Sequence, residues 1–206
     1  MRFIKLFKPE IIIVGNGGHA LSCVDIIESA GVYKIKGFIS NDTLIKDDIY
    51  GYPILGCDSD LKYLKKFFKF AFIGIGQTKK FIPRLNIFNS LVNLGYKLPT
   101  VVSPNAYVSS RSKIGSGVII MHGVTINAGV SIGSNCIINS QVNLDHGVNI
   151  GDHCHISTGA ILNGNVQIGS KTFIGSNVTI RQDLSINESS FIQMGSCIDN
   201  QYQKEQ

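Results

Sequence analysis

The sequence predicts two domains, a small α/β domain over residues 1–98 and a parallel β-helix over residues 99–206. The first half alternates short apolar runs with amphipathic stretches, which is typical of parallel strands joined by helices. The second half carries a branched aliphatic residue at every sixth position without a gap. A period of six fits neither a helix nor a hairpin, and it indicates a solenoid of hexapeptide repeats.

The α/β half begins with an apolar strand at residues 11–14, which runs into the glycine-rich segment Gly15-Asn16-Gly17-Gly18. A helix follows, with apolar residues at helical spacing from Leu21 to Ala30, and Gly31 ends it. The other expected elements are a strand at residues 36–39, a helix at 61–68, a strand at 70–75 and a helix at 83–94. Their alternation predicts a small, Rossmann-like parallel sheet with βαβ connections.

The repeat half contains an unbroken aliphatic series from Val102 to Ile198. In a hexapeptide solenoid each of these side chains points into a three-sided prism, and the position four residues later also points inward. Three hexapeptides make a coil of about 18 residues, so each side chain should lie over its equivalent one coil earlier. The corners between faces should favour Gly, Asn or Ser, which tolerate positive φ.

Composition and charge exclude several classes of protein. Hydrophobic residues make up 44% of the chain and charged residues 16%, which argues against disorder. The net charge of +5 is spread over the first half, so nucleic-acid binding is not favoured and a groove for nucleotide or coenzyme A phosphates fits equally well. No signal peptide and no apolar run of membrane-span length is present, so we expect a cytoplasmic protein without a membrane span.

The five cysteines form no CxxC pair, and we expect reduced thiols. Cys136 and Cys154 occupy inward positions one coil apart, so they should lie one above the other. A core pair of small thiols is favoured there over a disulfide or a metal pair.

Four segments together point to a family. They are Val14-Gly15-Asn16-Gly17-Gly18-His19, Phe38-Ile39-Ser40-Asn41-Asp42, Phe72-Ile73-Gly74-Ile75-Gly76, and residues 139–157 with His146. Over residues 11–196 the chain resembles the NeuD/PglD type of sugar acetyltransferases, typified by sialic acid O-acetyltransferase and the bacillosamine-pathway N-acetyltransferase. The resemblance implies a left-handed β-helix that transfers an acetyl group from acetyl-CoA to a sugar of bacterial surface polysaccharide or glycan biosynthesis. It also implies a homotrimer whose acetyl-CoA grooves lie between neighbouring prisms.

By this resemblance His146 is the general base. An attacking amine or hydroxyl must lose a proton, and imidazole accepts one near neutral pH. His146 lies two residues past an inward aliphatic, at a corner, and its neighbours one coil away, Ala128 and Gly164, are small and should leave room for substrate. We expect no simple acid–histidine pair with Asp145, because adjacent strand residues point to opposite faces.

The residue after His146 bears on the choice between N- and O-acetylation. Relatives in the N-acetyltransferase branch usually carry an acidic residue there, whereas this chain has Gly147, as in the sialic acid branch. The acceptor is therefore left open between a nucleotide-linked 4-amino sugar and sialic acid or a related nonulosonic acid.

The resemblance also assigns the coenzyme site. It implies acetyl-CoA contacts at His155, Gly164, Ser176 and Met194, with the backbone amide of Gly164 as the candidate that stabilises the oxyanion. His153 and His155 are two residues apart, but one pair without a third ligand is weak evidence, and no metal is predicted. His122 is expected to be a surface corner residue.

The amino-terminal glycines allow two interpretations. Gly15-x-Gly17-x-x-Ala20, with Asn41-Asp42 further on, approximates a dinucleotide fingerprint. In the family that the chain resembles, the same loop holds the sugar or its nucleotide, and no hydride is transferred, so this interpretation is favoured. The implied substrate-binding residues are Gly17, Gly18, His19, Ser40, Asn41 and Gly76.

Two further expectations concern the carboxyl end and the class of protein. Many relatives close over the coenzyme with a Gly-x-Pro-Ala segment, whereas here Ile198 runs into Asp199-Asn200-Gln201, so the part of the groove for the adenine is expected to be incomplete. The alternative to an enzyme is a non-catalytic hexapeptide scaffold or sugar-binding protein.

Overall fold

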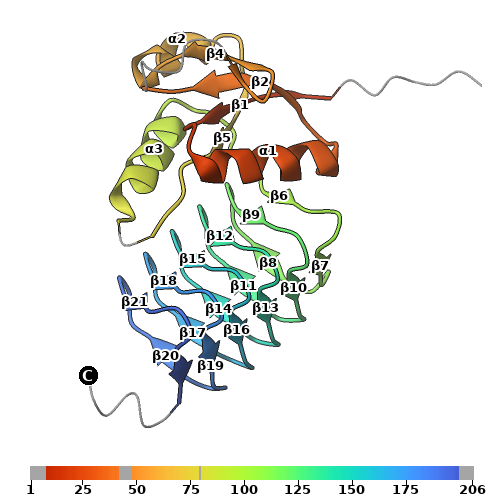
Figure 1. Ribbon diagram of the computed structural model, residues 1–206, viewed down its shortest axis with the longest axis vertical. Coiled ribbons are helices and arrows are strands. Elements are labelled where there is room, and N and C mark those ends of the chain that lie inside the picture. Colours follow the sequence, from red (N-terminus) through yellow and green to blue (C-terminus); the bar gives the residue numbers. More distant parts are fainter. Residues whose placement is uncertain (1–7, 42–47, 79, 200–206) are drawn as a thin grey trace, which may run out of the picture.

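The computed structural model describes residues 8–41, 48–78 and 80–199, which form an α/β domain seated on the first coils of a β-helix (Figure 1). This order of domains is the predicted one. Within the described ranges, no helix combines the length and the apolar character that crossing a bilayer requires.

The α/β domain is built on a five-stranded sheet with strand order β3-β4-β2-β1-β5. Its strands are β1 (Glu10–Val14), β2 (Lys34–Ile39), β3 (Asp48–Ile49), β4 (Tyr52–Gly56) and β5 (Phe70–Ile73). All neighbours pair in parallel except β3 and β4. The helical elements are α1 (Gly18–Ala30), the 3-10 turn η1 (Asp58–Asp60), α2 (Leu61–Leu64) and α3 (Ile82–Asn93).

Local sequence explains most of these elements. The apolar run Ile11–Val14 forms most of β1, an inner strand between β2 and β5, and is almost completely buried. Helix α1 ends at Gly31, whose φ of 66° lets its N–H reach the carbonyl of Ile27. The helix expected over residues 61–68 is shorter, because α2 ends at Leu64 and irregular turns follow.

The β3–β4 hairpin was not predicted. Pro53 lies in β4 opposite Asp48 of the edge strand β3 and is exposed. Proline lacks a backbone donor and is rare within sheets, so the sequence shows no clear strand signal there.

The β-helix has three faces, each a parallel sheet of two-residue strands. The first face contains β6 (Val101–Val102), β9 (Ile119–Ile120), β12 (Ile137–Ile138), β15 (His155–Ile156), β18 (Phe173–Ile174) and β21 (Phe191–Ile192). The second face contains β7 (Tyr107–Val108), β10 (Thr125–Ile126), β13 (Asn143–Leu144), β16 (Ile161–Leu162), β19 (Thr179–Ile180) and β22 (Cys197–Ile198). The third face contains β8 (Lys113–Ile114), β11 (Ser131–Ile132), β14 (Asn149–Ile150), β17 (Gln167–Ile168) and β20 (Ser185–Ile186).

The strand register confirms the predicted coil. Ile126 pairs with Leu144, and Leu144 pairs with Leu162, each one coil further along. The inward aliphatic residues pack into one continuous core, in which Leu144 and Leu162 are both 0% exposed. Cys136 and Cys154 are free and buried in this core, and the N–H of Cys154 donates to Cys136 Sγ at 3.4 Å. The pair is therefore the predicted stack of thiols.

The corners repeat with the same period. From Gly117 to Gly195, every sixth residue has a positive φ. Glycine and asparagine fill most of these positions, as expected, but Gln141, His153 and Lys171 also adopt φ values of 60–63°. Repetition of the coil therefore imposes the left-handed conformation even on side chains that rarely adopt it alone.

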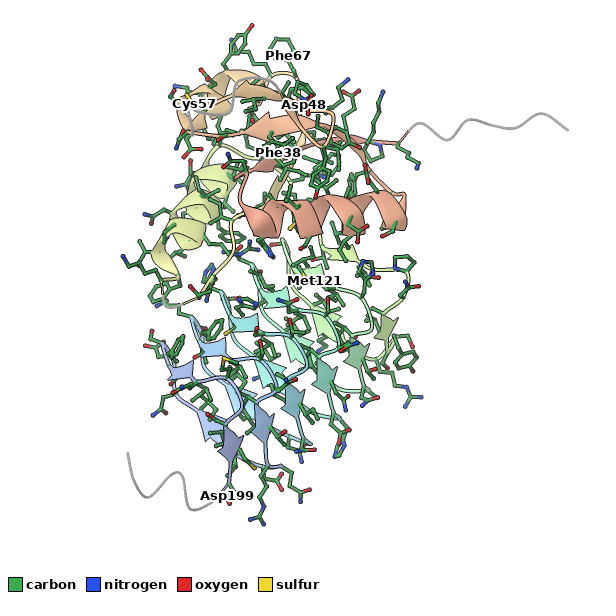
Figure 2. All side chains as sticks on the ribbon, in the orientation of Figure 1. Phe38, Asp48, Cys57, Phe67, Met121 and Asp199 are labelled. Carbon is green, nitrogen blue, oxygen red and sulfur yellow. The ribbon has the colours of Figure 1, made fainter. Side chains whose placement is uncertain are left out.

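The two domains share a core on the first face. Its outward residues Ile119 and Ile137 are completely buried in one cluster with Cys23 and Ile27 of α1. Figure 2 shows Met121 between α1 and the β-helix, in the same cluster. The amino-terminal domain therefore lies against the first face at β9, β12 and β15. The opposite edge of the prism, between the second and third faces, carries none of these contacts.

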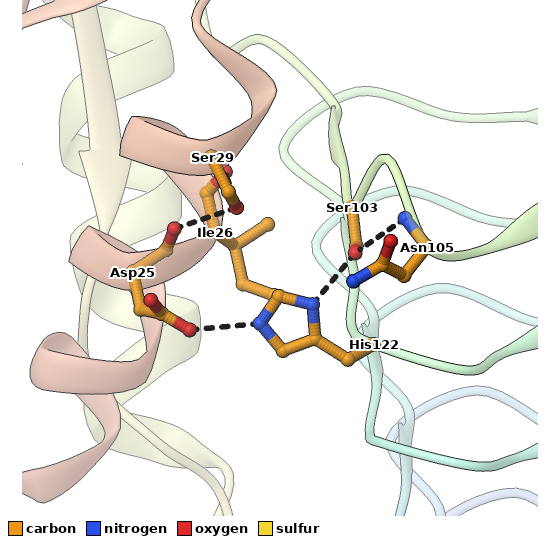
Figure 3. A network of polar contacts seen from close by, with 6 residues as sticks. All are labelled: Asp25, Ile26, Ser29, Ser103, Asn105 and His122. Carbon is orange, nitrogen blue, oxygen red and sulfur yellow. Dashed lines mark hydrogen bonds and ion pairs between the residues drawn. The ribbon is translucent and has the colours of Figure 1, made fainter.

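A polar bridge adds to this contact (Figure 3). His122 Nε2 lies 2.8 Å from Asp25 Oδ2 of α1, and its Nδ1 lies 2.7 Å from Ser103 Oγ. His122 lies at a corner, as expected, but its side chain is only 37% exposed and also joins the domains, which the sequence did not predict. Ser103 is 1% exposed, so the trio is a structural bridge and presents no accessible nucleophile.

Candidate functional site

The amino-terminal site is a pocket of about 490 Å³ where β1, β2 and β5 end. Pockets at the carboxyl ends of parallel strands are the usual ligand sites of such sheets. All the residues predicted to bind substrate lie in its lining: Gly17, Gly18, His19, Ser40, Asn41 and Gly76. The structure thus brings together three segments that are far apart in the sequence.

Glycines shape this pocket. Gly15 has a φ of 99°, and a Cβ there would lie 2.6 Å from Ile75 Cγ1. Gly17 caps α1 without a side-chain hydrogen bond, and a Cβ on Gly17 or Gly18 would meet nothing within 4 Å. The first turn of α1 therefore presents bare backbone amides to the pocket, an arrangement suited to phosphate.

Asp58 also lines the pocket and was not predicted. Asn41 Nδ2 donates to Asp58 Oδ2 at 2.8 Å, and the Asp58 N–H donates to Asn41 Oδ1 at 3.0 Å. Asp58 follows the unpredicted strand β4, so no local pattern pointed to it. Asp42, the other half of the expected ribose-reading pair, lies outside the described residues.

His19 is neutral and only partly satisfied. Burial, followed by the charge of Arg84 and then His155, lowers its pKa to about 3. Its Nε2 is buried and has no hydrogen-bond partner within the described part of the chain. A Cβ on Gly76 would lie 3.2 Å from His19 Cβ, so the glycine makes room for this ring.

His146 occupies a corner between the second and third faces, as predicted, and its side chain is 66% exposed. Its Nδ1 lies 3.1 Å from Asp145 Oδ1, and its backbone N–H donates to the same oxygen at 2.7 Å. These contacts, the backbone one first, lower the pKa of the Asp145 carboxyl. The expectation of no acid–histidine pair was therefore wrong, because both residues belong to a turn and strand alternation does not apply there.

The surroundings of His146 explain the two glycines near it. The imidazole lies over Gly164, where a Cβ would be 2.6 Å from His146 Cε1. The space above Gly164 thus holds the catalytic candidate itself, whereas we had expected it to hold substrate. Gly147 has a φ of 70°, and a side chain there would collide with Asn165 Oδ1. An acidic residue after the histidine is disfavoured here, and Asp145 supplies the carboxylate from the other side.

The remaining residues predicted to contact acetyl-CoA lie elsewhere on the prism. His155 is on the first face and 7% exposed; its Nδ1 donates to the carbonyl of Gln77, and Phe173 packs edge-on against its ring at 5.1 Å. Burial lowers the pKa of His155 to about 4. Ser176 and Met194 lie at the edge between the first and second faces, and Met194 is 72% exposed.

His153 packs against the α/β domain. Its Nδ1 lies 3.0 Å from Asn135 Nδ2, and Phe88 of α3 contacts its ring edge-on. Among the residues that the structure describes, no three side chains of metal-ligand type form a cluster. The tail beyond Asp199, where the coenzyme groove was expected to be incomplete, lies outside the described residues.

Family models match both halves of the chain. The PglD N-terminal domain matches residues 10–91, and the bacterial transferase hexapeptide model of six repeats matches residues 111–146 and 147–182. No curated protein matches the sequence.

Solved structures match nearly the whole chain. A histidine variant of perosamine N-acetyltransferase from Caulobacter crescentus, in complex with CoA and GDP-perosamine, superposes with a TM-score of 0.86 at 26% identity, covering 92% of this chain and 88% of that one. The acetyltransferase domain of PglB from Neisseria gonorrhoeae has a TM-score of 0.86 at 26% identity, covering 93% and 92%. The same domain in complex with acetyl coenzyme A has a TM-score of 0.85 at 26% identity, covering 94% of both chains.

The fold and the repeats thus define a left-handed β-helix acyltransferase of the hexapeptide class. With a PglD-type domain in front of the repeats, the chain belongs to the NeuD/PglD type of sugar acetyltransferases. It is an acetyl-CoA-dependent sugar acetyltransferase, and acetyl-CoA is its co-substrate.

Proposed function

We propose that this enzyme N-acetylates a nucleotide-linked amino sugar, with His146 as the general base, in a site shared between subunits of a homotrimer. The observation that carries the proposal is the Asp145–His146 pair, which gives the exposed imidazole a carboxylate partner. The presence of Gly147 had favoured the O-acetylating branch because it left the histidine without an acid. Asp145 removes that reason, and the perosamine enzyme, solved with a nucleotide-linked amino sugar, supports the N-acetylating alternative.

The geometry of the pair suits proton transfer. Nδ1–H of His146 donates to Asp145, which leaves the lone pair of Nε2 to accept a proton. As the sugar amine bonds to the thioester carbonyl carbon, its proton passes to Nε2 and the carbonyl becomes an oxyanion. Collapse of this intermediate breaks the C–S bond, and the imidazolium returns the proton to the coenzyme thiolate. A backbone amide near Gly164 is the candidate donor to the oxyanion.

The position of His146 supports a shared site. The α/β domain, with its pocket, lies against the first face, whereas His146 lies at the opposite edge of the same prism. One chain therefore cannot bring its own pocket and its own His146 to one substrate, because the prism stands between them. In a cyclic trimer the edge of one prism meets the first face of the next.

The first test is an assay of thiol release from acetyl-CoA. We expect release with nucleotide-linked 4-amino sugars and none with sialic acid, and His146→Asn should abolish it. His122→Asn is the matched control, since it also changes a corner histidine but should retain activity. Full activity of His146→Asn, or release with sialic acid alone, contradicts the proposal. If acetyl-CoA fails to raise the melting temperature of the wild type, the scaffold alternative is supported instead.

The second test is complementation between two inactive variants. Gly17→Phe should fill the pocket without disturbing the fold, because a Cβ there meets nothing within 4 Å. If sites are shared, each site takes its pocket from one subunit and its His146 from another. In trimers reassembled from equal amounts of Gly17→Phe and His146→Asn, each of these two parts is intact in about half of the cases. Roughly a quarter of the sites should therefore have both an intact pocket and an intact His146. No recovered activity in mixed trimers contradicts a shared site.

A further inference from the structure

Arg84 of α3 is completely buried between the two domains. Its Nη1 donates to the carbonyls of Ile73 and Ile75, at 2.9 and 2.7 Å. On the β-helix side, Nε donates to the carbonyl of Asn135 at 3.3 Å, and Nη2 donates to that of Gly117 at 3.5 Å. One guanidinium thus ties the end of β5 to two corners of the β-helix.

Among the described residues, no acid neutralises this charge. The ion pairs of the described residues join Lys36 to Glu10, His122 to Asp25 and His146 to Asp145, and none includes Arg84. The positive charge of Arg84 adds to burial in lowering the pKa of the imidazoles of His19, His153 and His155, and it partly offsets the rise that burial causes in the pKa of the thiols of Cys23 and Cys136. Burial lowers the pKa of Arg84 only to about 10, so the group is a cation at neutral pH.

A buried cation without an anion is unusual, because charges in protein interiors are normally paired. The carbonyls satisfy its hydrogen-bond donors but carry no net charge. The neighbouring imidazoles are held neutral by burial. A bound anion near Arg84 would supply the negative charge that the described residues do not.

The position of Arg84 shows where that charge would bind. Ile73 and Ile75, whose carbonyls it holds, flank Gly74, and Gly74 and Ile75 line the pocket. Across the pocket, α1 presents the positive end of its dipole. Of the described lining residues none is lysine or arginine, and the one carboxylate, Asp58, is bonded to Asn41 at the end of β2.

We propose that Arg84 is a positioning residue that makes the pocket selective for a diphosphate, by placing an unneutralised charge behind its Gly74–Ile75 wall. Arg84 does not touch the ligand. It fixes the wall against the β-helix, and its field, little screened in the interior, favours the doubly charged pyrophosphate of a nucleotide sugar. This inference rests on the proposed function, because it takes the pocket as the nucleotide site.

The test compares ligands that differ only in phosphate. Dissociation constants of uridine, UMP and UDP, and of guanosine, GMP and GDP, are measured by calorimetry or ligand-observed NMR for the full-length wild type, Arg84→Lys and Arg84→Gln. Arg84→Lys keeps the charge, whereas Arg84→Gln removes it but keeps an amide donor. Lys113→Gln, an exposed lysine on the third face, is the control for net charge.

We expect Arg84→Gln to weaken diphosphate binding about 10- to 100-fold, or about 1.4–2.7 kcal/mol, while nucleoside binding changes less than about threefold. Arg84→Lys and Lys113→Gln should stay near the wild type. Equal weakening of nucleoside and diphosphate would show a merely structural role and overturn the inference, as would an unchanged diphosphate affinity. Should Arg84→Gln fail to fold, the affinities of the wild type for nucleoside, monophosphate and diphosphate are the deciding measurement. Equal wild-type affinities for nucleoside and diphosphate also overturn the inference. A wild type that binds none of these ligands refutes the nucleotide pocket itself, and with it the proposed function.

Discussion

The imidazole of His146 lies over the α-carbon of Gly164, one coil further along the β-helix. A Cβ at position 164 would be 2.6 Å from Cε1 and 2.7 Å from Nε2 of the ring. Gly164 does not have a positive φ, so alanine is compatible with its backbone. The glycine is therefore required by the ring above it and not by its own conformation.

We predict that Gly164→Ala displaces the His146 ring and lowers kcat roughly 10- to 100-fold, because a general base acts only from a defined position. The ring is exposed and can swing away, so the melting temperature should hardly change. Steady-state kinetics and thermal unfolding measure both effects. Gln182→Ala, at the equivalent position of the next coil, is the control and should be fully active. A fully active Gly164→Ala would show that the stacked position of the ring does not matter.

Asp145→Asn tests the carboxylate partner. The asparagine keeps an oxygen for the His146 backbone N–H but loses the charge that stabilises the imidazolium. We expect kcat to fall roughly 10-fold or more, with little change in KM for acetyl-CoA. Asp183→Asn is a matched control, because Asp183 lies on the same edge and its carboxylate accepts a hydrogen bond from Asn165 and not from a histidine. Equal kcat for Asp145→Asn and the wild type would mean that His146 works without an acid.

The β-helix could be predicted because its information is local and repeated. Each coil places the same residue type at the same position, so the spacing of Leu144 and Leu162 in the sequence already predicts that they stack. The pocket was also predictable, since its glycine motifs mark the strand ends. The Asp145–His146 pair was not, because the alternation rule for strands was applied to a turn.

Contacts between the domains could not be predicted, because no local sequence pattern marks them. Arg84 and Asn135 are far apart in the sequence, and neither belongs to a motif that would show their contact. His122 looks like any corner residue until α1 places Asp25 beside it. Asp58 was missed for a related reason, because it follows β4, a strand whose proline hides it in the sequence.

The Ser103–His122–Asp25 bridge should affect stability and not catalysis. Ser103 Oγ is buried and bonded to His122 Nδ1, and it also accepts the N–H of Asn105 at 3.1 Å. We expect Ser103→Ala to lower the free energy of unfolding by about 1 kcal/mol or slightly more, since it leaves a buried donor unpaired. Asp25→Asn should cost less than about 1 kcal/mol, because Asp25 is exposed. Urea unfolding measures both, and a loss of kcat at unchanged stability would assign the trio a chemical role.

The buried histidines predict acid sensitivity. The pKa of His155 falls from 6.5 to about 4 in the folded protein, chiefly through burial. Between these values the unfolded chain binds a proton that the folded chain does not, so stability is full above pH 6.5 and falls as the pH drops towards 4. His19, with a pKa of about 3, acts in the same direction. Each group should contribute a slope of up to about 1.4 kcal/mol per pH unit.

The substitution His155→Gln isolates one of these slopes. Glutamine keeps an N–H that can donate to the carbonyl of Gln77, but it does not titrate. Urea unfolding between pH 7 and 4.5 should show a shallower loss of stability for His155→Gln than for the wild type. Gln182→Ala is the control, because it changes an exposed corner residue and leaves every titratable group in place. Identical slopes for His155→Gln and the wild type would mean that the His155 ring takes up its proton in the folded protein as readily as in the unfolded chain.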